Sequence, residues 1–486
     1  MILAIDQGTT GTTCLVFDER GRVAGRAYSE FEQHFPRPGW VEHDASEIWD
    51  VTRRVARSAL DGAGIDGRRL AGIGITNQRE TVVAWDRDSG EPLHRAIVWQ
   101  DRRTAERCDE LREQGREELF RERTGLVLDS YFSGTKMEWL IKHGDVDPGA
   151  AFGTIDSWLV YKLTGRHVTD YSNASRTLLF DIRKLAWDEE LCELLSVRPA
   201  SLGEPVKSAE VYGETKEFGG SVPVAGIAGD QQAALYGQAC HERGQGKNTY
   251  GTGSFVLENA GTEAPDNARG LLTTVAWGVE DRVDYALEAS IFVTGAAVQW
   301  LRDGLGIIKT AAETEGLARS LDGNDGVYLV PAFAGLGSPH WDPYARGTIV
   351  GLTRGNGRAH LARAALESIA YQTVDAVRAL EQASGVELDE LKADGGASEN
   401  SWLMRFQADM LGVPVVVPEV SETTALGAGY LAGVATGLWS ESDVRSMWRQ
   451  AGGYEPTMSA DERQRLLAEW HAALDRARSN DRPRRG

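Results

Sequence analysis

The sequence predicts an α/β protein of two similar domains that face each other across a cleft. The first observation is a hairpin at the start of the chain, where the apolar run 2–5 leads into a Gly/Thr-rich turn and residues 14–18 form the returning strand. The second is a repeat of this design halfway along, because residues 248–258 place a Gly-Thr-Gly tip before an apolar strand. The third is the length of 486 residues, which is too long for one hydrophobic core and fits two sizeable domains.

The tip of the first hairpin carries the groups of a phosphate-binding site. Gly8 and Gly11 let the backbone approach a ligand closely, and backbone N–H groups can form an anion-binding concavity. The hydroxyls of Thr9 and Thr10 can donate to phosphate oxygens, while the Asp6 carboxylate can hold a hydrated metal ion. No Gly-Lys-Ser/Thr follows, so this is not a Walker loop, and one such hairpin alone is typical of an ordinary turn. Two of them, one in each half, indicate two domains that face a single nucleotide.

This arrangement resembles the actin, hexokinase and chaperone-ATPase superfamily, whose ribonuclease H-like domains each present one such hairpin to ATP. The resemblance implies two ribonuclease H-like domains around a central nucleotide cleft, and we place these domains at residues 1–238 and 239–486. Each predicted domain then begins close to one Gly/Thr hairpin.

Composition and charge exclude several classes of function. The chain is 42% hydrophobic and 26% charged, as in an ordinary folded protein. Its formal net charge of −20 disfavours a general nucleic-acid or anionic-membrane surface, since both would repel it at long range. The four cysteines are scattered without a CxxC pair or a secretory leader, and no run approaches the roughly twenty apolar residues of a membrane span. We therefore expect a cytoplasmic protein with reduced thiols, no nucleic-acid partner, no membrane span and no structural zinc site.

In the first half, charged residues follow two predicted buried strands. Residues 71–76 form a Gly/Ile strand that leads to Arg79 and Glu80, and ligands usually bind at the carboxyl ends of such strands. A surface ion pair is the alternative for these two residues, and it is equally well supported. Residues 222–229 form a second strand that delivers Asp230 to its end. A carboxylate at the mouth of a cleft suits a general base, and the alternative is an N-cap for the following helix.

The segment between these strands offers aromatic walls for a polyol site. Residues 82–85 and 96–99 predict a hairpin that ends in Trp99. An aromatic wall beside Arg and Glu suits a polyol, whose C–H faces need apolar contact and whose hydroxyls need bidentate partners. Tyr131 enters an amphipathic helix, and aromatic residues at helical spacing are more typical of a core than of ligand contacts. Residues 169–175 are expected to form a hydrogen-bonded loop.

The second half supplies groups suited to a nucleotide. Small residues at the start of the helix predicted in 292–301 leave room for a purine or a ribose. Residues 391–400 predict a strand, a diglycine turn and a helix start, where the backbone can abut an adenine or a phosphate and Asn400 can bond a base edge. Other expected elements are a helix over 48–62 capped by Asp44, antiparallel strands over 272–277 and 283–288, a long core helix over 360–383, a small-residue helix over 423–433 and a frayed tail over 476–486.

Seven motifs stand in the order found in the glycerol-phosphorylating members of the FGGY family of carbohydrate kinases, which the chain resembles over nearly its whole length. These motifs are residues 6–10, 77–80, 99–103, 131–136, 229–232, 250–253 and 394–397. The resemblance implies ATP-dependent phosphorylation of glycerol to sn-glycerol 3-phosphate. It also implies that the N-terminal domain binds the polyol and the C-terminal domain binds the nucleotide.

The resemblance assigns roles to individual residues. The glycerol hydroxyls would be bound by Arg79, Glu80, Tyr131, Asp230 and Gln231, and its carbons would lie against Trp99 and Phe255. The nucleotide would be held by Thr9, Thr10, Gly11, Thr252, Gly295, Gln299, Gly396 and Asn400, and Mg²⁺ by Asp6. We predict in-line transfer of the γ-phosphoryl group, with Asp230 as general base and with closure of the domains to exclude water.

Two positions depart from the family pattern. Many glycerol-phosphorylating members carry arginine where this chain has Thr13, which leaves one phosphate contact open. The loop 215–221 lacks the arginine with which some bacterial members bind fructose 1,6-bisphosphate, so that inhibition is not expected. A homo-oligomer, either a dimer or a tetramer, is expected. Two alternatives stay open, namely a family member acting on a pentulose, hexulose or longer polyol, and an actin-type nucleotide-gated protein that performs no transfer.

Overall fold

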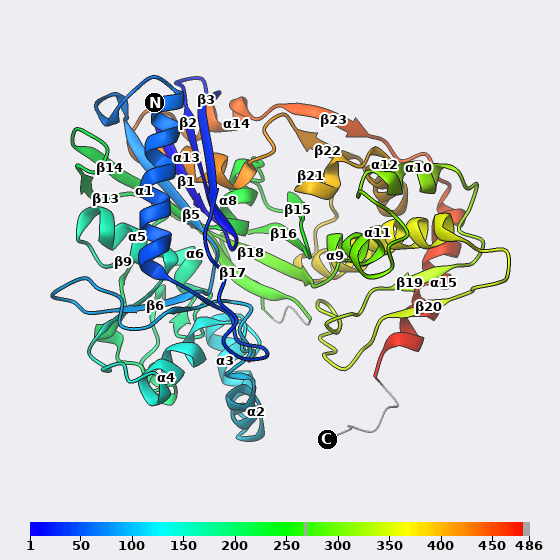
Figure 1. The fold of residues 1–486 in the computed structure, drawn as a ribbon, viewed down its shortest axis with the longest axis horizontal. Coiled ribbons are helices and arrows are strands. Elements are labelled where there is room, and N and C mark those ends of the chain that lie inside the picture. Colours follow the sequence, from blue (N-terminus) through cyan, green and yellow to red (C-terminus); the bar gives the residue numbers. More distant parts are fainter. Residues whose placement is uncertain (267–269, 480–486) are drawn as a thin grey trace.

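The computed structural model describes residues 1–266 and 270–479, and its main sheet of 13 strands runs through both halves of the molecule (Figure 1). The same order of five strands occurs twice within this sheet. The N-terminal set is β3 (Val23–Glu30), β2 (Gly11–Phe17), β1 (Ile2–Gln7), β5 (Gly72–Asn77) and β14 (Val222–Gly229). The C-terminal set is β18 (Arg282–Ile291), β16 (Ser254–Gly261), β15 (Gly246–Tyr250), β21 (Leu391–Asp394) and β22 (Val415–Pro418).

Both sets also share their strand directions. In each, the first three strands are antiparallel to one another, and the last two run parallel to the third. The third and second strands of each set form a Gly/Thr hairpin, β1–β2 and β15–β16, as predicted. The repeat confirms the expected α/β fold of two ribonuclease H-like units.

The two sets are joined through a narrow part of the sheet. There β17 (Leu272–Val279), beside β18, pairs with β13 (Ala209–Thr215) at a single position, Ala209 with Val279. β13 is antiparallel to β14, while β23 (Gln450–Tyr454) extends the far edge beyond β22. A separate four-stranded sheet consists of β4 (Glu42–His43), β7 (Ala96–Ile97), β6 (Val82–Trp85) and β8 (Ala151–Thr154).

Helices cover one face of the N-terminal set because their apolar sides match the strands. α1 (Ala45–Gly62) begins at its predicted cap, since the Asp44 side chain accepts hydrogen bonds from the N–H groups of Ser46 and Glu47. The apolar side of α1 packs with Ile73 and Ile75 of β5 in one core, which also contains Trp158 of α5 (Ile155–Thr164).

The opposite face of the N-terminal set is covered by a helix from the other end of the chain. α13 (Thr423–Ala435) packs against β1, β5 and β14, and also beside α8 (Asp230–Gly237). Its glycines allow this approach, since a Cβ atom on Gly427 would lie 1.8 Å from the carbonyl oxygen of Ala233. The close packing predicted for residues 423–433 is confirmed, and it interlocks the two halves.

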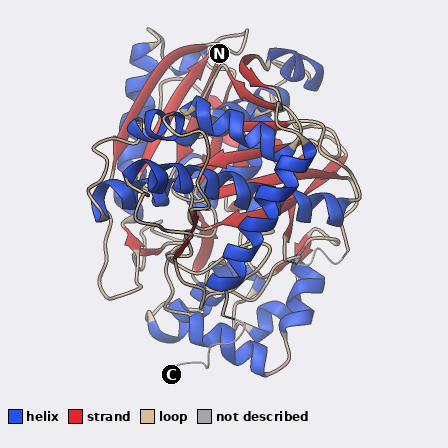
Figure 2. Ribbon diagram, turned by 90° about the vertical axis from the view of Figure 1, so that its right-hand side faces the viewer, coloured by secondary structure: helices blue, strands red, loops and turns tan. Residues whose placement is uncertain are grey.

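The C-terminal half is dominated by the predicted core helix, α11 (Arg358–Ser384), which packs against β18 and β19 (Tyr328–Val330). Figure 2 shows this half from its outer side, with helices in front of the strands. The other helices here are α9 (Gly295–Gln299), α10 (Glu313–Arg319), α12 (Ser401–Leu411), α14 (Glu441–Met447) and α15 (Ala460–Ala477). Tyr371 of α11 and Trp470 of α15 stack with ring centroids 5.3 Å apart, which fixes α15 on the core.

Two expectations about local structure are wrong. Residues 169–175 contain a short helix, α6 (Tyr171–Ala174), because the Asp170 side chain accepts from the N–H groups at its start. The tail is not frayed from residue 476, since α15 continues to Ala477 and the Ser479 hydroxyl donates to Asp342 over 2.7 Å. The remainder of that predicted tail, residues 480–486, lies outside the described residues.

The remaining helices of the N-terminal half are α2 (Ala105–Glu113), α3 (Glu117–Thr124), α4 (Ser133–His143) and α7 (Glu189–Leu194). Short paired strands are also present, namely β9 (Val168–Asp170), β10 (Phe180–Asp181), β11 (Ala186–Trp187), β12 (Glu204–Val206) and β20 (Thr348–Val350). Short 3₁₀ helices span Gly67–Arg69, Pro199–Ser201 and Gly396–Glu399, and a π-helical turn, Trp300–Gly304, continues α9. Within residues 1–266 and 270–479, no helix combines the length and the apolar character needed to cross a bilayer.

Candidate active site

The chain that follows β5 enters a buried network of two arginines and two glutamates. Arg79 and Glu80 are 2% and 1% exposed, so the alternative of a surface ion pair is wrong. Arg176, which follows α6, donates from Nε to Glu80 Oε1 over 2.6 Å. Glu288 of β18 accepts from Arg79 Nη1 over 2.5 Å and from Arg176 Nη2 over 3.1 Å. Burial raises the pKa of Glu288, but the two guanidinium groups outweigh burial and lower it to about 2.

Asp230 lies beside this network at the carboxyl end of β14. Its Oδ1 is 3.1 Å from Arg79 Nε, and 30% of its side chain is exposed. The N-cap of α8 is Gly229, and Asp230 Oδ1 accepts from the N–H of Gln231 over 2.7 Å, so Asp230 is the first helical residue and not the cap. Burial raises the pKa of Asp230, while Arg79 and Lys247 oppose the rise. A partly exposed carboxylate with a raised pKa and a fixed orientation can accept a proton.

Three aromatic side chains adjoin the network. The rings of Trp99 and Tyr131 meet edge to face with centroids 5.6 Å apart, and the Phe255 ring lies 5.6 Å from the Arg79 guanidinium carbon. Arg79 Nη2 donates to the Tyr131 hydroxyl over 3.4 Å. Trp99 Nε1 donates to the Thr9 hydroxyl over 2.9 Å, which ties this wall to the first hairpin. The residues expected to contact a polyol therefore lie together.

A buried lysine connects the surroundings of Asp230 to the second hairpin. Lys247 of β15 donates from Nζ to the side-chain oxygen of Gln231 over 2.5 Å and to the Thr249 hydroxyl over 2.7 Å. Burial lowers the pKa of Lys247 to about 8, although the charges of Asp394 and Asp230 act in the opposite direction. Because Lys247 occupies the Gln231 oxygen, the Gln231 amide NH₂ is the group left for a ligand.

Both hairpin tips are closed by a backbone hydrogen bond between glycines. The N–H of Gly8 donates to the carbonyl of Gly11 over 2.9 Å, and that of Gly251 to Gly253 over 2.8 Å. Gly11 is buried, and because glycine has no side chain it can contact a ligand only through its backbone. The threonines exposed at the two tips are Thr10 and Thr252.

The predicted nucleotide elements of the second half meet at the second hairpin. The N–H of Gly295, at the start of α9, donates to Gly251 over 3.1 Å, and a Cβ atom on Gly295 would lie 2.5 Å from that oxygen. Gln299 is exposed at the end of α9. The diglycine turn after β21 docks on the same hairpin, since a Cβ atom on Gly395 would lie 2.4 Å from the Tyr250 oxygen.

The diglycine turn leaves open space on its other side. A Cβ atom on Gly396 would have no neighbour within 4 Å, so a ligand can approach this backbone. Asn400 is the N-cap of α12 and accepts from the N–H of Leu403 through Oδ1 over 3.0 Å. The Asn400 oxygen is therefore used for capping, and its amide nitrogen donates to the Thr314 hydroxyl over 3.4 Å, which leaves one amide N–H for a base edge.

Asp6 fits the role of a metal ligand. Burial, followed by the negative charges of Asp230 and Glu422, raises the pKa of Asp6 to about 7. Among the described residues, no group donates a hydrogen bond to its carboxylate. A second carboxylate nearby and the absence of a competing donor suit a cation, and a single protein ligand with several waters is typical of Mg²⁺. Within the described ranges no cluster of three or more His, Cys, Asp or Glu could hold a metal.

Three charged members of the site, Arg176, Lys247 and Glu288, were not predicted. The available indication was Glu288 itself, because a glutamate inside the apolar run 285–289 needs a buried positive partner. Lys247 lies in the first strand of the second hairpin, and Arg176 follows a segment rich in Ser and Asn. Neither position shows a local pattern that distinguishes it from a surface cation.

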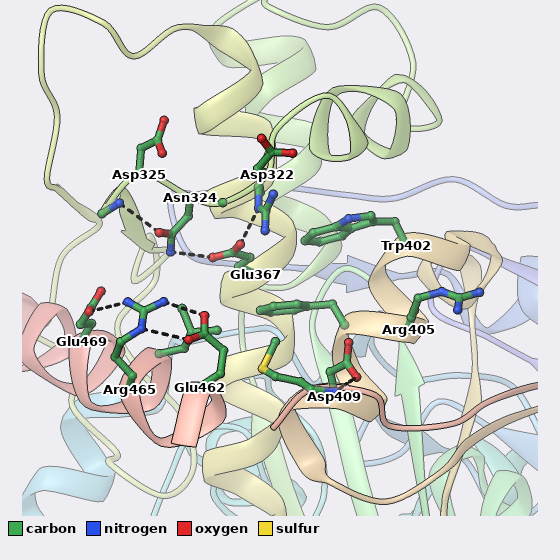
Figure 3. A pocket seen from close by; sticks show the side chains of 16 residues that line it. Asp322, Asn324, Asp325, Glu367, Trp402, Arg405, Asp409, Glu462, Arg465 and Glu469 are labelled. Carbon is green, nitrogen blue, oxygen red and sulfur yellow. Dashed lines mark hydrogen bonds and ion pairs between the residues drawn. The ribbon is translucent and has the colours of Figure 1, made fainter. Parts of the chain in front are cut away.

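A cavity of about 460 Å³ on the outer side of the C-terminal half is separate from this site (Figure 3). It lies between residues 322–326, α11, α12 and α15, and no predicted site residue lines it. Its charged side chains largely satisfy one another; for example, Glu367 accepts from Arg363 Nε over 2.7 Å and from Asn324 Nδ2 over 2.9 Å. The outer cavity therefore shares no lining residue with the network around Asp230.

Comparison with known proteins identifies relatives over nearly the whole chain. Residues 1–237 match the N-terminal domain and residues 246–436 the C-terminal domain of the FGGY family of carbohydrate kinases. The chain is 56% identical to the glycerol kinase of Deinococcus radiodurans, over 98% of this chain and 97% of that protein. It is 55% identical to glycerol kinase 2 of Thermotoga maritima, over 98% of each. Its structure is similar to that of Plasmodium falciparum glycerol kinase with ADP, with a TM-score of 0.91, 35% identity and 98% coverage of both chains.

Proposed function

Because the chain belongs to the FGGY family of carbohydrate kinases, we propose that it phosphorylates glycerol with ATP to form sn-glycerol 3-phosphate. The observation that carries the proposal is the position of Asp230, 3.1 Å from Arg79 and linked to both hairpins. One link passes from Arg79 through the rings of Tyr131 and Trp99 to Thr9. The other passes from Gln231, the next residue along the chain, through Lys247 to Thr249. The glycerol kinases among the relatives support the choice of glycerol over a longer polyol.

Transfer proceeds in line from ATP to a terminal hydroxyl of glycerol. Asp230 accepts the hydroxyl proton while the glycerol oxygen forms its bond to the γ-phosphorus and the bond to the β-phosphate oxygen breaks, releasing ADP. Arg79 holds the Asp230 carboxylate in place. The other proposed contacts to glycerol are Glu80, Tyr131 and the Gln231 amide for its hydroxyls, and Trp99 and Phe255 for its carbons.

The hairpins hold the nucleotide opposite the polyol. Thr9, Thr10 and Gly11 in the first, and Thr252 in the second, donate to the phosphates. The remaining proposed contacts are Gly295, Gln299, Gly396 and Asn400. Asp6 would hold a hydrated Mg²⁺, which neutralises phosphate charge when bound. Closure of the domains around both substrates would limit competing transfer to water.

Glycerol-dependent release of ADP from the purified protein tests this function. We expect ATP turnover to be slow alone and strongly stimulated by glycerol and Mg²⁺, and ³¹P NMR should identify sn-glycerol 3-phosphate. A panel of pentuloses, hexuloses and longer polyols serves as the specificity control. If one of these compounds and not glycerol stimulates turnover, that compound is the substrate in place of glycerol. If no polyol changes the rate of ATP turnover, the kinase function is refuted.

The proposal includes a homo-oligomer in the cytoplasm, either a dimer or a tetramer. Membership of the family is its support. Size-exclusion chromatography with light scattering on the full chain should give a mass of two or four times 53.0 kDa. A single species of monomer mass at micromolar concentration would contradict this part of the proposal.

A further inference from the structure

We propose that Glu288 is a positioning residue, through which the C-terminal half sets the orientation of the arginine that faces the polyol. The inference rests on the proposed function, because it concerns the same site. The resemblance to the family implies no role for this side chain. Glu288 lies on β18, whereas the two arginines it contacts belong to the N-terminal half.

Both carboxylate oxygens of Glu288 are fully engaged. Oε2 accepts from Arg79 Nη1 over 2.5 Å. Oε1 accepts from Arg79 Nη2 over 3.2 Å, from Arg176 Nη2 over 3.1 Å and from the Ser290 hydroxyl over 3.2 Å. The side chain is 0% exposed, so it cannot touch a ligand itself. Its effect on the reaction must pass through the arginines.

The bidentate contact determines which edge of Arg79 faces the cleft. With Nη1 and Nη2 bound to Glu288, the guanidinium also donates from Nη1 to Gln232 over 3.2 Å. Nε is not bound by Glu288, and it forms the ion pair with Asp230 Oδ1 over 3.1 Å. A planar guanidinium fixed at two nitrogens has no freedom to rotate, so the distance between Arg79 and the proposed base is set by Glu288.

Charge balance gives Glu288 a second effect. Arg79 and Arg176 are both buried, and Glu288 is the one carboxylate among the described residues that contacts both within 3.2 Å. Without its charge, two guanidinium groups would share Glu80 and Asp230. Arg79 would then pair more closely with Asp230, which would withdraw the carboxylate from the hydroxyl of a bound polyol.

β18 also connects the two substrate sites. The strand ends at Ile291, and α9 with Gly295 begins four residues later. In register, Ser290 pairs with Phe255 of β16, which places Phe255 and Glu288 on neighbouring strands. The strand that positions Arg79 is thus continuous with the segment that docks on the second hairpin.

Glu288→Gln tests the proposal, because glutamine keeps the volume and one acceptor but removes the charge. The matched control is Glu367→Gln, which alters a glutamate of similar burial that is also paired with an arginine, in the outer cavity, whose lining includes no predicted site residue (Figure 3). We expect kcat/KM for glycerol to fall about 100-fold in Glu288→Gln, since breaking a buried ion pair typically costs several kcal/mol. KM for ATP should stay within about threefold, and Glu367→Gln should leave both values within about threefold.

If Glu288→Gln does not fold, the variant Glu288→Asp tests the same proposal. Aspartate retains the charge but is one methylene shorter, so it can satisfy one arginine and not both. We expect a stable protein, by circular dichroism and thermal unfolding, with a glycerol-specific loss of about tenfold. Unchanged glycerol constants in a folded variant, or an equal rise in KM for both substrates, would overturn the inference. An inactive parent protein would instead refute the proposed function, so the two failures are distinguishable.

Discussion

Asp230→Asn removes the proposed proton acceptor with little change in shape. Asparagine keeps the side-chain oxygen that accepts from the N–H of Gln231 at 2.7 Å and that faces Arg79 Nε at 3.1 Å. What it loses is the negative charge and the ability to take a proton. The substitution therefore separates catalysis by Asp230 from its contribution to the fold.

The size of the effect follows from the role. A positioned general base usually contributes about 10²- to 10⁴-fold to the rate, or roughly 3 to 5 kcal/mol of activation free energy. Asp230 is fixed by Arg79 on one side and by α8 on the other, so its contribution should lie within this range. Nucleotide affinity should change less than about threefold, because Thr10 and Thr252 at the hairpin tips are separate from Asp230 in the site.

Steady-state ADP release with glycerol and ATP varied in turn gives kcat and both KM values, and calorimetry with ADP gives the nucleotide affinity. We expect kcat to fall at least 100-fold while the ADP dissociation constant is retained. Glu367→Gln provides the control for an equivalent loss of charge elsewhere. A kcat within about threefold of the parent would show that Asp230 is not the base, and a parallel loss of ADP binding would indicate a structural role.

Three further substitutions test the surroundings of the site and the fold. Burial lowers the pKa of His241 to about 3, whereas a histidine in an unfolded chain has a pKa of about 6.5. Below about pH 6.5 only the unfolded chain therefore binds this proton, and the free energy of unfolding of the parent protein falls. The variant His241→Gln lacks this group, so the amount by which its unfolding free energy in urea lies below that of the parent should be about 2 kcal/mol smaller at pH 5 than at pH 7. A difference that does not change with pH would contradict the lowered pKa of His241. Gly427→Ala, whose Cβ would lie 1.8 Å from a backbone oxygen of α8, should lose up to about 3 kcal/mol of unfolding free energy; unchanged stability would mean that α13 and α8 separate easily. Trp99→Phe keeps the aromatic wall but removes the hydrogen-bond donor to Thr9, so KM for ATP should rise about two- to tenfold. An unchanged KM would show that the Trp99–Thr9 hydrogen bond does not contribute to nucleotide binding by the first hairpin.

Local chemistry accounts for the elements that were predicted correctly. The two hairpins combine apolar runs with Gly/Thr tips, and the start of α1 follows from Asp44, whose side chain caps the next two N–H groups. The positions of Arg79 and Asp230 were predictable because parallel strands end at one edge of a sheet. The burial of Arg79 and Glu80 was not predictable, since the sequence alone left a surface ion pair equally possible for these two residues.

The parts that sequence did not predict depend on contacts between distant residues. Arg176 and Glu288 are separated by 112 positions, and their pairing depends on how β18 packs against the N-terminal half. Asn400 was predicted to contact a base, yet its oxygen caps α12, because capping and ligand binding favour the same residue type. Composition and spacing cannot distinguish such uses before the packing is known.

The placement of α13 has a consequence for biosynthesis. When a ribosome has completed residues 1–238, the helix that covers Gly74 and Gly226 is still unmade, since in the finished molecule those glycines lie against Ala428 and Ala432. One face of the N-terminal set of strands is then exposed or bound by a chaperone until nearly two hundred more residues have been synthesised. Splitting the gene at the predicted domain boundary would leave the first fragment prone to aggregate, and supplying residues 239–486 in trans should restore its solubility.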